Sequence, residues 1–156
     1  MMKKNEDEKV LTHMDLNGEV LSQKRNLKIL VVEDNSMSFT LTATMIQRLT
    51  GVFPDRAVNG QEAVECAKDT SYDLIFMDQY MPVMNGSEAS ERINALSSTD
   101  KKPMLVGLSG ATHPADIKKF HRSGIDQFLA KPLRLQKLKE VLISCSVSSP
   151  LALKTA

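Results

Sequence analysis

Residues 27–35 read Leu-Lys-Ile-Leu-Val-Val-Glu-Asp-Asn, a short apolar run that ends in two carboxylates. The run shows little alternation of apolar and polar side chains, which is typical of a strand covered on both faces of a sheet. Similar runs recur along the chain at 53–58, 73–77, 103–108 and 126–130. With 27–32 as the first, we predict five strands.

Amphipathic segments alternate with these runs and predict five helices. We expect Ser36 to be the N-cap of the first helix, and the apolar residues after it recur every four positions. This spacing predicts the buried stripe of that helix: Met37, Leu41, Met45 and Leu49. Strands that alternate with helices over short connections indicate an α/β fold with a parallel sheet and right-handed crossovers.

Length and composition describe one ordinary globular domain. The 156 residues include 20 basic and 19 acidic ones, and the net charge of +1 argues against a dedicated nucleic-acid binder. Cys66 and Cys145 lie too far apart to indicate a zinc site or a disulfide framework. Residues 1–9 are charged and lack the apolar stretch typical of a signal peptide, and no apolar run approaches the roughly 20 residues that span a bilayer. We therefore expect a cytoplasmic protein without a membrane partner, with the nucleus as the alternative compartment.

The two ends of the chain differ from its middle. Segment 1–26 mixes five basic and five acidic residues with few apolar ones, and we predict a flexible N-terminal extension. Segment 147–156 contains Ser148, Ser149 and Pro150 near its start, and we predict a C-terminal tail. The domain itself is assigned to 27–146.

Polar side chains follow four of the predicted strands. Glu33 and Asp34 come after the first, Asp78 after the third, Ser109 after the fourth and Lys131 after the fifth. Ligands of such sheets bind outside the carboxyl ends of the strands, so we expect these groups to share one site. Carboxylates that lie close together repel one another unless a cation lies between them or their pKa values rise.

Phosphoryl transfer with Mg²⁺ is the chemistry that this set of groups favours. Mg²⁺ prefers oxygen ligands and bridges carboxylates to a phosphate, and Lys131 adds a positive charge. Ser109 offers a hydroxyl and Gly110 an unobstructed backbone amide to a bound anion. Asp78 is a competent nucleophile that needs no general base, because its carboxylate is already ionised at pH 7. The glycine patterns of dinucleotide and nucleoside triphosphate sites are absent from the sequence.

Four motifs carry a resemblance to a known family over about Leu27 to Cys145. They are Val31-Val32-Glu33-Asp34-Asn35, Asn59-Gly60-Gln61-Glu62-Ala63, Met77-Asp78-Gln79-Tyr80-Met81-Pro82-Val83-Met84-Asn85-Gly86 and Phe128-Leu129-Ala130-Lys131-Pro132. Together they resemble the receiver domain of two-component response regulators. The motif sequences are most similar to those in receivers of hybrid histidine kinases and of stand-alone plant response regulators that lack an output domain.

The resemblance implies a flavodoxin-like (CheY-like) fold, a doubly wound five-stranded parallel sheet of order 2-1-3-4-5 with five helices. It implies that Asp78 accepts a phosphoryl group from a phosphohistidine and that Lys131 contacts this group. It also implies that Mg²⁺ is held by three carboxylates and one backbone carbonyl, those of Glu33, Asp34, Asp78 and Tyr80 respectively.

The resemblance further implies a switch. Ser109 moves to hydrogen-bond the phosphoryl group, and Phe128 rotates inward in step, which shifts a two-state equilibrium. Several residues depart from the family pattern, among them Ser38, which stands where hybrid-kinase receivers often have Asn. Gly110 stands where Ala is frequent, which we expect to loosen the loop, and Phe128 lacks the hydroxyl of a tyrosine. The large ring of Tyr80 is expected near the site.

We expect the first helix to form part of the docking face for the phosphoryl donor. Asn35 and Phe39 are assigned to this face, since Phe39 lies off the predicted apolar stripe and is expected to be exposed. Met37 is the alternative apolar anchor, although its place on the stripe favours the core.

These inferences lead to one hypothesis and two alternatives. The first is a monomeric, single-domain phosphorelay response regulator without a DNA-binding output domain. It is not an enzyme in the ordinary sense, although it promotes its own phosphorylation and slow dephosphorylation. Its partner is a histidine phosphotransfer protein or a histidine kinase, and it switches or drains a pathway. The first alternative is a phosphorylation-independent pseudo-receiver that binds proteins. The second, an Asp-dependent phosphohydrolase, is disfavoured because Tyr80 stands where its second Asp belongs.

Overall fold

A parallel sheet forms the centre of the molecule. The computed structural model describes residues 13–14, 20–21, 27–96, 101–110 and 114–148. The sheet strands are β3 (Ile29–Val32), β4 (Asp55–Ala57), β5 (Leu74–Asp78), β6 (Met104–Ser109) and β7 (Gln127–Ala130). Their order is β4-β3-β5-β6-β7, with every neighbouring pair parallel. In chain order this is 2-1-3-4-5, so the predicted topology is confirmed.

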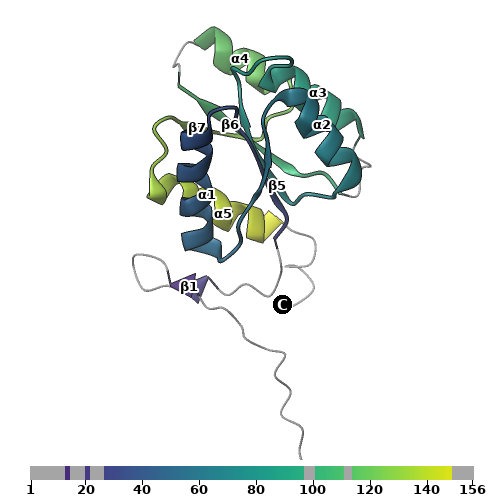
Figure 1. Ribbon diagram of the computed structural model, residues 1–156. Coiled ribbons are helices and arrows are strands. Elements are labelled where there is room, and N and C mark those ends of the chain that lie inside the picture. Colours follow the sequence, from purple (N-terminus) through teal and green to yellow (C-terminus); the bar gives the residue numbers. More distant parts are fainter. Residues whose placement is uncertain (1–12, 15–19, 22–26, 97–100, 111–113, 149–156) are drawn as a thin grey trace, which may run out of the picture.

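Five helices cover the two faces of this sheet (Figure 1). They are α1 (Ser36–Thr50), α2 (Gly60–Asp69), α3 (Gly86–Leu96), α4 (Pro114–Arg122) and α5 (Leu135–Ser148). Helices α1 and α5 pack on one face and α2, α3 and α4 on the other, and each face has its own apolar cluster. Strand β3 explains the unbroken apolar run, because Ile29 and Val31 enter one cluster while Leu30 and Val32 enter the other.

The buried face of α1 differs from the predicted stripe. Met37 is 84% exposed and Leu41 57% exposed, so the prediction that they lie in the core is wrong. The residues that α1 buries are Phe39, Thr42, Ala43, Ile46, Leu49 and Thr50. This set also follows helical spacing, and its small and hydroxyl-bearing members allow α1 to lie close to the sheet.

The start of α1 also differs by one residue from the prediction. The N-cap is Asn35 and not Ser36, because the Asn35 side chain accepts a hydrogen bond from the backbone N–H of Ser38 at 3.0 Å. An asparagine side chain in this position satisfies one of the free N–H groups of the first turn.

The predicted extension and tail lie mostly outside the described residues. Within segment 1–26 the structure describes an antiparallel pair of very short strands, β1 (His13–Met14) and β2 (Val20–Leu21). At the other end, α5 continues to Ser148 and so enters the segment predicted as a tail. Among the helices in the described part of the chain, none has both the length and the apolar character needed to cross a membrane.

Candidate functional site

Three carboxylates meet at the carboxyl end of the sheet. Glu33 and Asp34 directly follow β3, and Asp78 is the last residue of the adjacent strand β5. One oxygen atom from each lies within 4.8 Å of the others. Glu33 and Asp78 are buried, whereas Asp34 is exposed. The convergence predicted from the strand ends is therefore present for these three residues.

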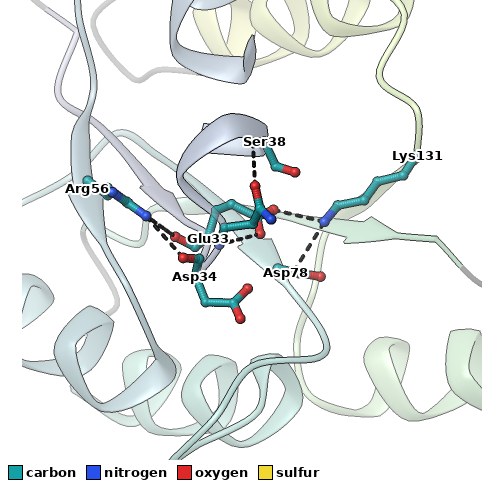
Figure 2. Close-up of polar contacts among 7 residues, drawn as sticks. Glu33, Asp34, Ser38, Arg56, Asp78 and Lys131 are labelled. Carbon is teal, nitrogen blue, oxygen red and sulfur yellow. Dashed lines mark hydrogen bonds and ion pairs between the residues drawn. The ribbon is translucent and has the colours of Figure 1, made fainter. Parts of the chain in front are cut away.

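Lys131 contacts the two buried carboxylates (Figure 2). Its Nζ lies 2.8 Å from Glu33 Oε2 and 3.2 Å from Asp78 Oδ2. Burial raises the pKa of Glu33, and the hydrogen bond from Lys131 opposes this shift only in part. Burial alone would lower the pKa of Lys131, but the Glu33 hydrogen bond and the nearby carboxylates outweigh it and raise the pKa. The charged ammonium form of Lys131 is thus favoured beside the carboxyl groups of Glu33 and Asp78.

The backbone around Glu33 and Asp34 is held from the opposite side by Arg56 (Figure 2). Its Nη2 donates to the carbonyl oxygen of Asp34 at 3.1 Å and to that of Glu33 at 3.4 Å. Asn35 adds a backbone N–H bond to Glu33 Oε1 at 3.1 Å. Sequence reasoning did not identify Arg56, because no motif marks a side chain that reaches its neighbours from an adjacent strand.

Ser109 and Gly110 lie beside this cluster at the end of β6. Ser109 is half-buried, and its carbonyl oxygen accepts a hydrogen bond from the Lys131 N–H at 2.9 Å. This bond joins the two strand ends that carry the predicted hydroxyl and ammonium groups. Gly110 is exposed, and a Cβ added there would meet no atom within 4 Å. The backbone at Gly110 is therefore open to solvent.

Phe128 is turned onto the sheet. It is the register partner of Gly107 on β6, and a Cβ at Gly107 would come within 3.0 Å of the Phe128 ring. The ring also packs edge-on against Phe120, at 5.4 Å between centroids, and against His121 at 4.6 Å. The absence of a side chain at Gly107 thus creates the space that the aromatic ring occupies, a feature that the sequence reading overlooked.

The loop after Asp78 is fixed by buried polar contacts. The buried Gln79 side chain accepts hydrogen bonds from the Ser87 backbone N–H at 3.0 Å and from its hydroxyl at 2.9 Å. A Cβ at Gly86 would overlap the carbonyl group of Asp78, so only glycine allows α3 to begin so close to the carboxylate. The side chain of Tyr80 is 57% exposed.

The predicted docking residues fall into two groups. Asn35 is exposed at the start of α1. Phe39 is only 8% exposed, so the prediction that it is exposed is wrong, and it does not serve as a surface anchor. Its ring packs edge-on against Phe53 at 6.2 Å and lies under the guanidinium of Arg56, whose Cζ is 4.9 Å from the ring centroid. These aromatic and cationic contacts favour the buried position.

The donor set fits a Mg²⁺ ion. All three candidate ligands are carboxylates, the oxygen ligands that Mg²⁺ prefers, and exposed Asp34 leaves one side open for water ligands. Within the cluster that the structure describes, Lys131 is the ammonium that faces these carboxylates. A divalent cation would balance the remaining negative charge.

Comparison with known proteins identifies the family. The sequence model of the response regulator receiver domain matches residues 29–143. The chain therefore belongs to the response regulator receiver family, the signalling modules of two-component and phosphorelay systems.

Two curated relatives differ greatly in length. The chain is 34% identical over 122 residues to the two-component response regulator ORR41 of Oryza sativa subsp. japonica, a match that covers 76% of this chain and 94% of the rice protein. It is 37% identical over 124 residues to the hybrid signal transduction histidine kinase G of Dictyostelium discoideum, which covers 78% of this chain and 4% of the kinase. The similarity to the kinase is thus confined to a small part of a much longer protein.

Two solved structures share the fold. The receiver domain of the sensor histidine kinase PA1611 from Pseudomonas aeruginosa PAO1, with a magnesium ion coordinated in its active site cleft, aligns with a TM-score of 0.72 at 28% identity, over 80% of this chain and 100% of that one. The receiver domain of Ssk1, in a co-crystal with the Saccharomyces cerevisiae histidine phosphotransfer signaling protein Ypd1, aligns with a TM-score of 0.70 at 26% identity, over 80% of this chain and 93% of that one.

Proposed function

We propose that this protein is a phosphorelay receiver whose Asp78 accepts a phosphoryl group from a phosphohistidine. The observation that carries the proposal is the ion-paired cluster at the sheet edge. Asp78 lies there within 3.2 Å of the Lys131 ammonium, beside two further carboxylates. Such an arrangement favours a reaction in which charge is neutralised around a transferred phosphoryl group. We assign this function to residues 27–146.

The transfer is a direct displacement at phosphorus. A carboxylate oxygen of Asp78 forms the new P–O bond while the P–N bond of the phosphohistidine breaks, and the electron pair of that bond leaves with the imidazole. An ionised carboxylate needs no general base, so the surrounding residues contribute position and charge. Lys131 neutralises charge beside Asp78, while Ser109 and the amide of Gly110 are assigned to the phosphoryl oxygens.

Mg²⁺ is the cofactor that we assign to this site. Glu33, Asp34 and Asp78, with the backbone carbonyl of Tyr80, are the groups assigned to hold it, and when bound it supplies positive charge at the phosphoryl oxygens. The magnesium ion in the receiver of the Pseudomonas kinase supports this assignment.

The partner that we infer is a histidine phosphotransfer protein, with a histidine kinase as the alternative donor. The Ypd1 co-crystal supports this choice, since the receiver in it has the same fold. The match over most of the rice response regulator supports a role without an appended output domain. In that role the protein drains phosphoryl groups from a pathway or binds another protein when phosphorylated, with Ser109 and Phe128 as the assigned switch residues.

A pseudo-receiver that works without phosphorylation is the second candidate. The complete set of Glu33, Asp34, Asp78 and Lys131 argues against it, because a module that only binds proteins has no need of this charge cluster. The two candidates differ in whether the protein becomes labelled.

The proposal predicts that the wild-type protein gains one phosphoryl group from phosphoramidate, or from a phosphorylated histidine phosphotransfer protein, in the presence of Mg²⁺. Asp78→Asn should lose this labelling completely, because an amide is not a nucleophile for phosphorus. It should retain the fold, since the change removes one of several repelling charges. Intact-protein mass spectrometry measures the added group, and circular dichroism checks the fold.

Asp69→Asn on α2 is the matched control, because Asp69 is exposed and lies outside the cluster. It should be labelled like the wild type. Labelling of Asp78→Asn at the wild-type level would exclude Asp78 as the acceptor. An unlabelled wild-type protein would favour the pseudo-receiver.

A further inference from the structure

Arg56 holds the two carboxylates that follow β3 through their backbone and not through their side chains. Besides the two bonds from Nη2 to the carbonyl oxygens of Asp34 and Glu33, Nε lies 3.4 Å from the carbonyl oxygen of Glu33. Neither carbonyl belongs to the sheet or to α1, so the guanidinium satisfies two acceptors at the exit of the strand. A planar guanidinium can engage both at once, which a single ammonium cannot do.

Asp34 depends on this contact more than Glu33 does. Glu33 is also held by Lys131 and by the backbone N–H of Asn35. Among the residues that the structure describes, Arg56 is the only hydrogen-bond partner of Asp34. The exposed Asp34 side chain therefore takes its direction from a peptide group that Arg56 fixes.

Arg56 is itself held in place. Its guanidinium lies over the Phe39 ring, and the rings of Phe39 and Phe53 make a T-shaped contact. Stacking of this kind is attractive and limits the rotation of the guanidinium. Phe39 thus acts inside the molecule as the support of Arg56.

We propose that Arg56, supported by Phe39, is a positioning residue for the cation site: it orients the Glu33–Asp34 backbone so that the Asp34 carboxylate points toward Asp78. This inference rests on the proposed function, because it requires that Asp34 ligates a cation. Residues that orient metal ligands without touching the metal commonly affect metal affinity by roughly 10- to 100-fold.

The charge of Arg56 and its positioning contacts affect cation affinity in opposite directions, so the choice of variant matters. Removing a positive charge beside the site would strengthen cation binding, whereas losing the two-pronged contact would weaken it. Arg56→Lys keeps the charge and removes the planar fork and the stacking. It therefore isolates the positioning role.

The test is a titration with MgCl₂ by isothermal calorimetry, repeated with Mn²⁺ by electron paramagnetic resonance. Arg56→Lys should bind Mg²⁺ about 10-fold more weakly than the wild type. Phe39→Leu, which keeps an apolar side chain but removes the ring, should weaken binding in the same direction by less. Arg48→Lys, at an exposed position on α1, is the matched control and should bind like the wild type.

A double-mutant cycle separates positioning from general destabilisation. If Arg56 acts through Asp34, then Arg56→Lys should have little further effect on affinity in an Asp34→Asn background, whereas independent effects would add. Wild-type affinity in both Arg56→Lys and Phe39→Leu would overturn the inference and leave the proposed function standing. Absence of cation binding by the wild-type protein would overturn both. Melting curves recorded without Mg²⁺ identify any variant that fails to fold, in which case the other variant decides.

Discussion

At the scale of single residues, two glycines differ in what they allow: Gly107 lies within β6 and Gly110 directly after it. Gly107 leaves the space in which the Phe128 ring lies, whereas Gly110 has open space on the side where a Cβ would project. Neither has a left-handed backbone conformation, so an alanine is compatible with the local backbone at both positions. The same substitution therefore tests packing at one site and only chain entropy at the other.

Gly107→Ala should destabilise the protein by about 1–3 kcal/mol, because the new methyl group would force the Phe128 ring away from Phe120. Gly110→Ala should be neutral or stabilising by up to about 1 kcal/mol, through its effect on the unfolded chain. Urea unfolding measures both changes. A neutral Gly107→Ala would mean that the ring moves at little energetic cost.

The residues of the charge cluster were predictable from sequence, and those that support it were not. Glu33, Asp34 and Asp78 follow apolar runs, and parallel strands bring their carboxyl ends to one edge. Arg56 acts through a long side chain that reaches the backbone of the neighbouring strand. Neither sequence periodicity nor residue spacing indicates this contact between Arg56 and the neighbouring backbone, so it becomes visible only in the structure.

At the scale of helices and strands, α1 was predicted as a helix, but the prediction of its buried face was wrong. The large aliphatic residues Met37 and Leu41 suggested a stripe, but the helix buries Thr42 and Thr50 instead. The Thr50 hydroxyl donates to the carbonyl oxygen of Ile46 at 2.8 Å, which allows a polar side chain to be buried. Residue size alone therefore does not identify the buried face of this helix.

The exposed face of α1 is the surface that we expect a phosphotransfer protein to contact. The double substitution Met37→Ala with Leu41→Ala should slow phosphoryl transfer from such a protein by about 10-fold or more, because the exposed apolar anchors are removed. Labelling by phosphoramidate should stay unchanged, since the substituted residues lie outside the charge cluster. Time courses with both donors measure the two rates.

Leu96→Ala is the control for this docking prediction. Leu96 is 47% exposed but lies on α3, on the opposite face of the sheet from α1. It should leave both rates unchanged. An equal loss with the two donors would indicate damage to the site itself, and unchanged transfer from the protein donor would place docking elsewhere.

At the scale of the whole molecule, the chemical reactivity of the Cys145 thiol can serve as a probe of unfolding. It is buried on α5, and its thiol lies 3.7 Å from the carbonyl oxygen of Asp73, the residue before β5. Burial, with a smaller contribution from the charge of Asp73, raises the pKa of Cys145 to about 11. Because the thiolate is the reactive form, the folded protein should protect this cysteine at pH 8.

In a Cys66→Ser background, Cys145 should react with iodoacetamide at pH 8 at least about 100-fold more slowly in the folded protein than in the unfolded chain. The reaction rate should increase as the pH is raised toward the pKa of the Cys145 thiol, which is about 11. It should also rise with urea, in parallel with the loss of helical circular dichroism. A fast reaction without urea would show that α5 opens independently of the sheet.

The edge of the sheet where Arg56 lies has a further consequence for the behaviour of the protein at high concentration. Among the strands that the structure describes, β4 pairs only with β3; it is three residues long, with exposed Asp55 at its start. Short, charged edge strands offer few free backbone groups to a strand from another molecule, which is how sheet proteins resist aggregation through their edges. We therefore expect the strand that carries Arg56 to give neighbouring copies little opportunity to extend the sheet at this edge.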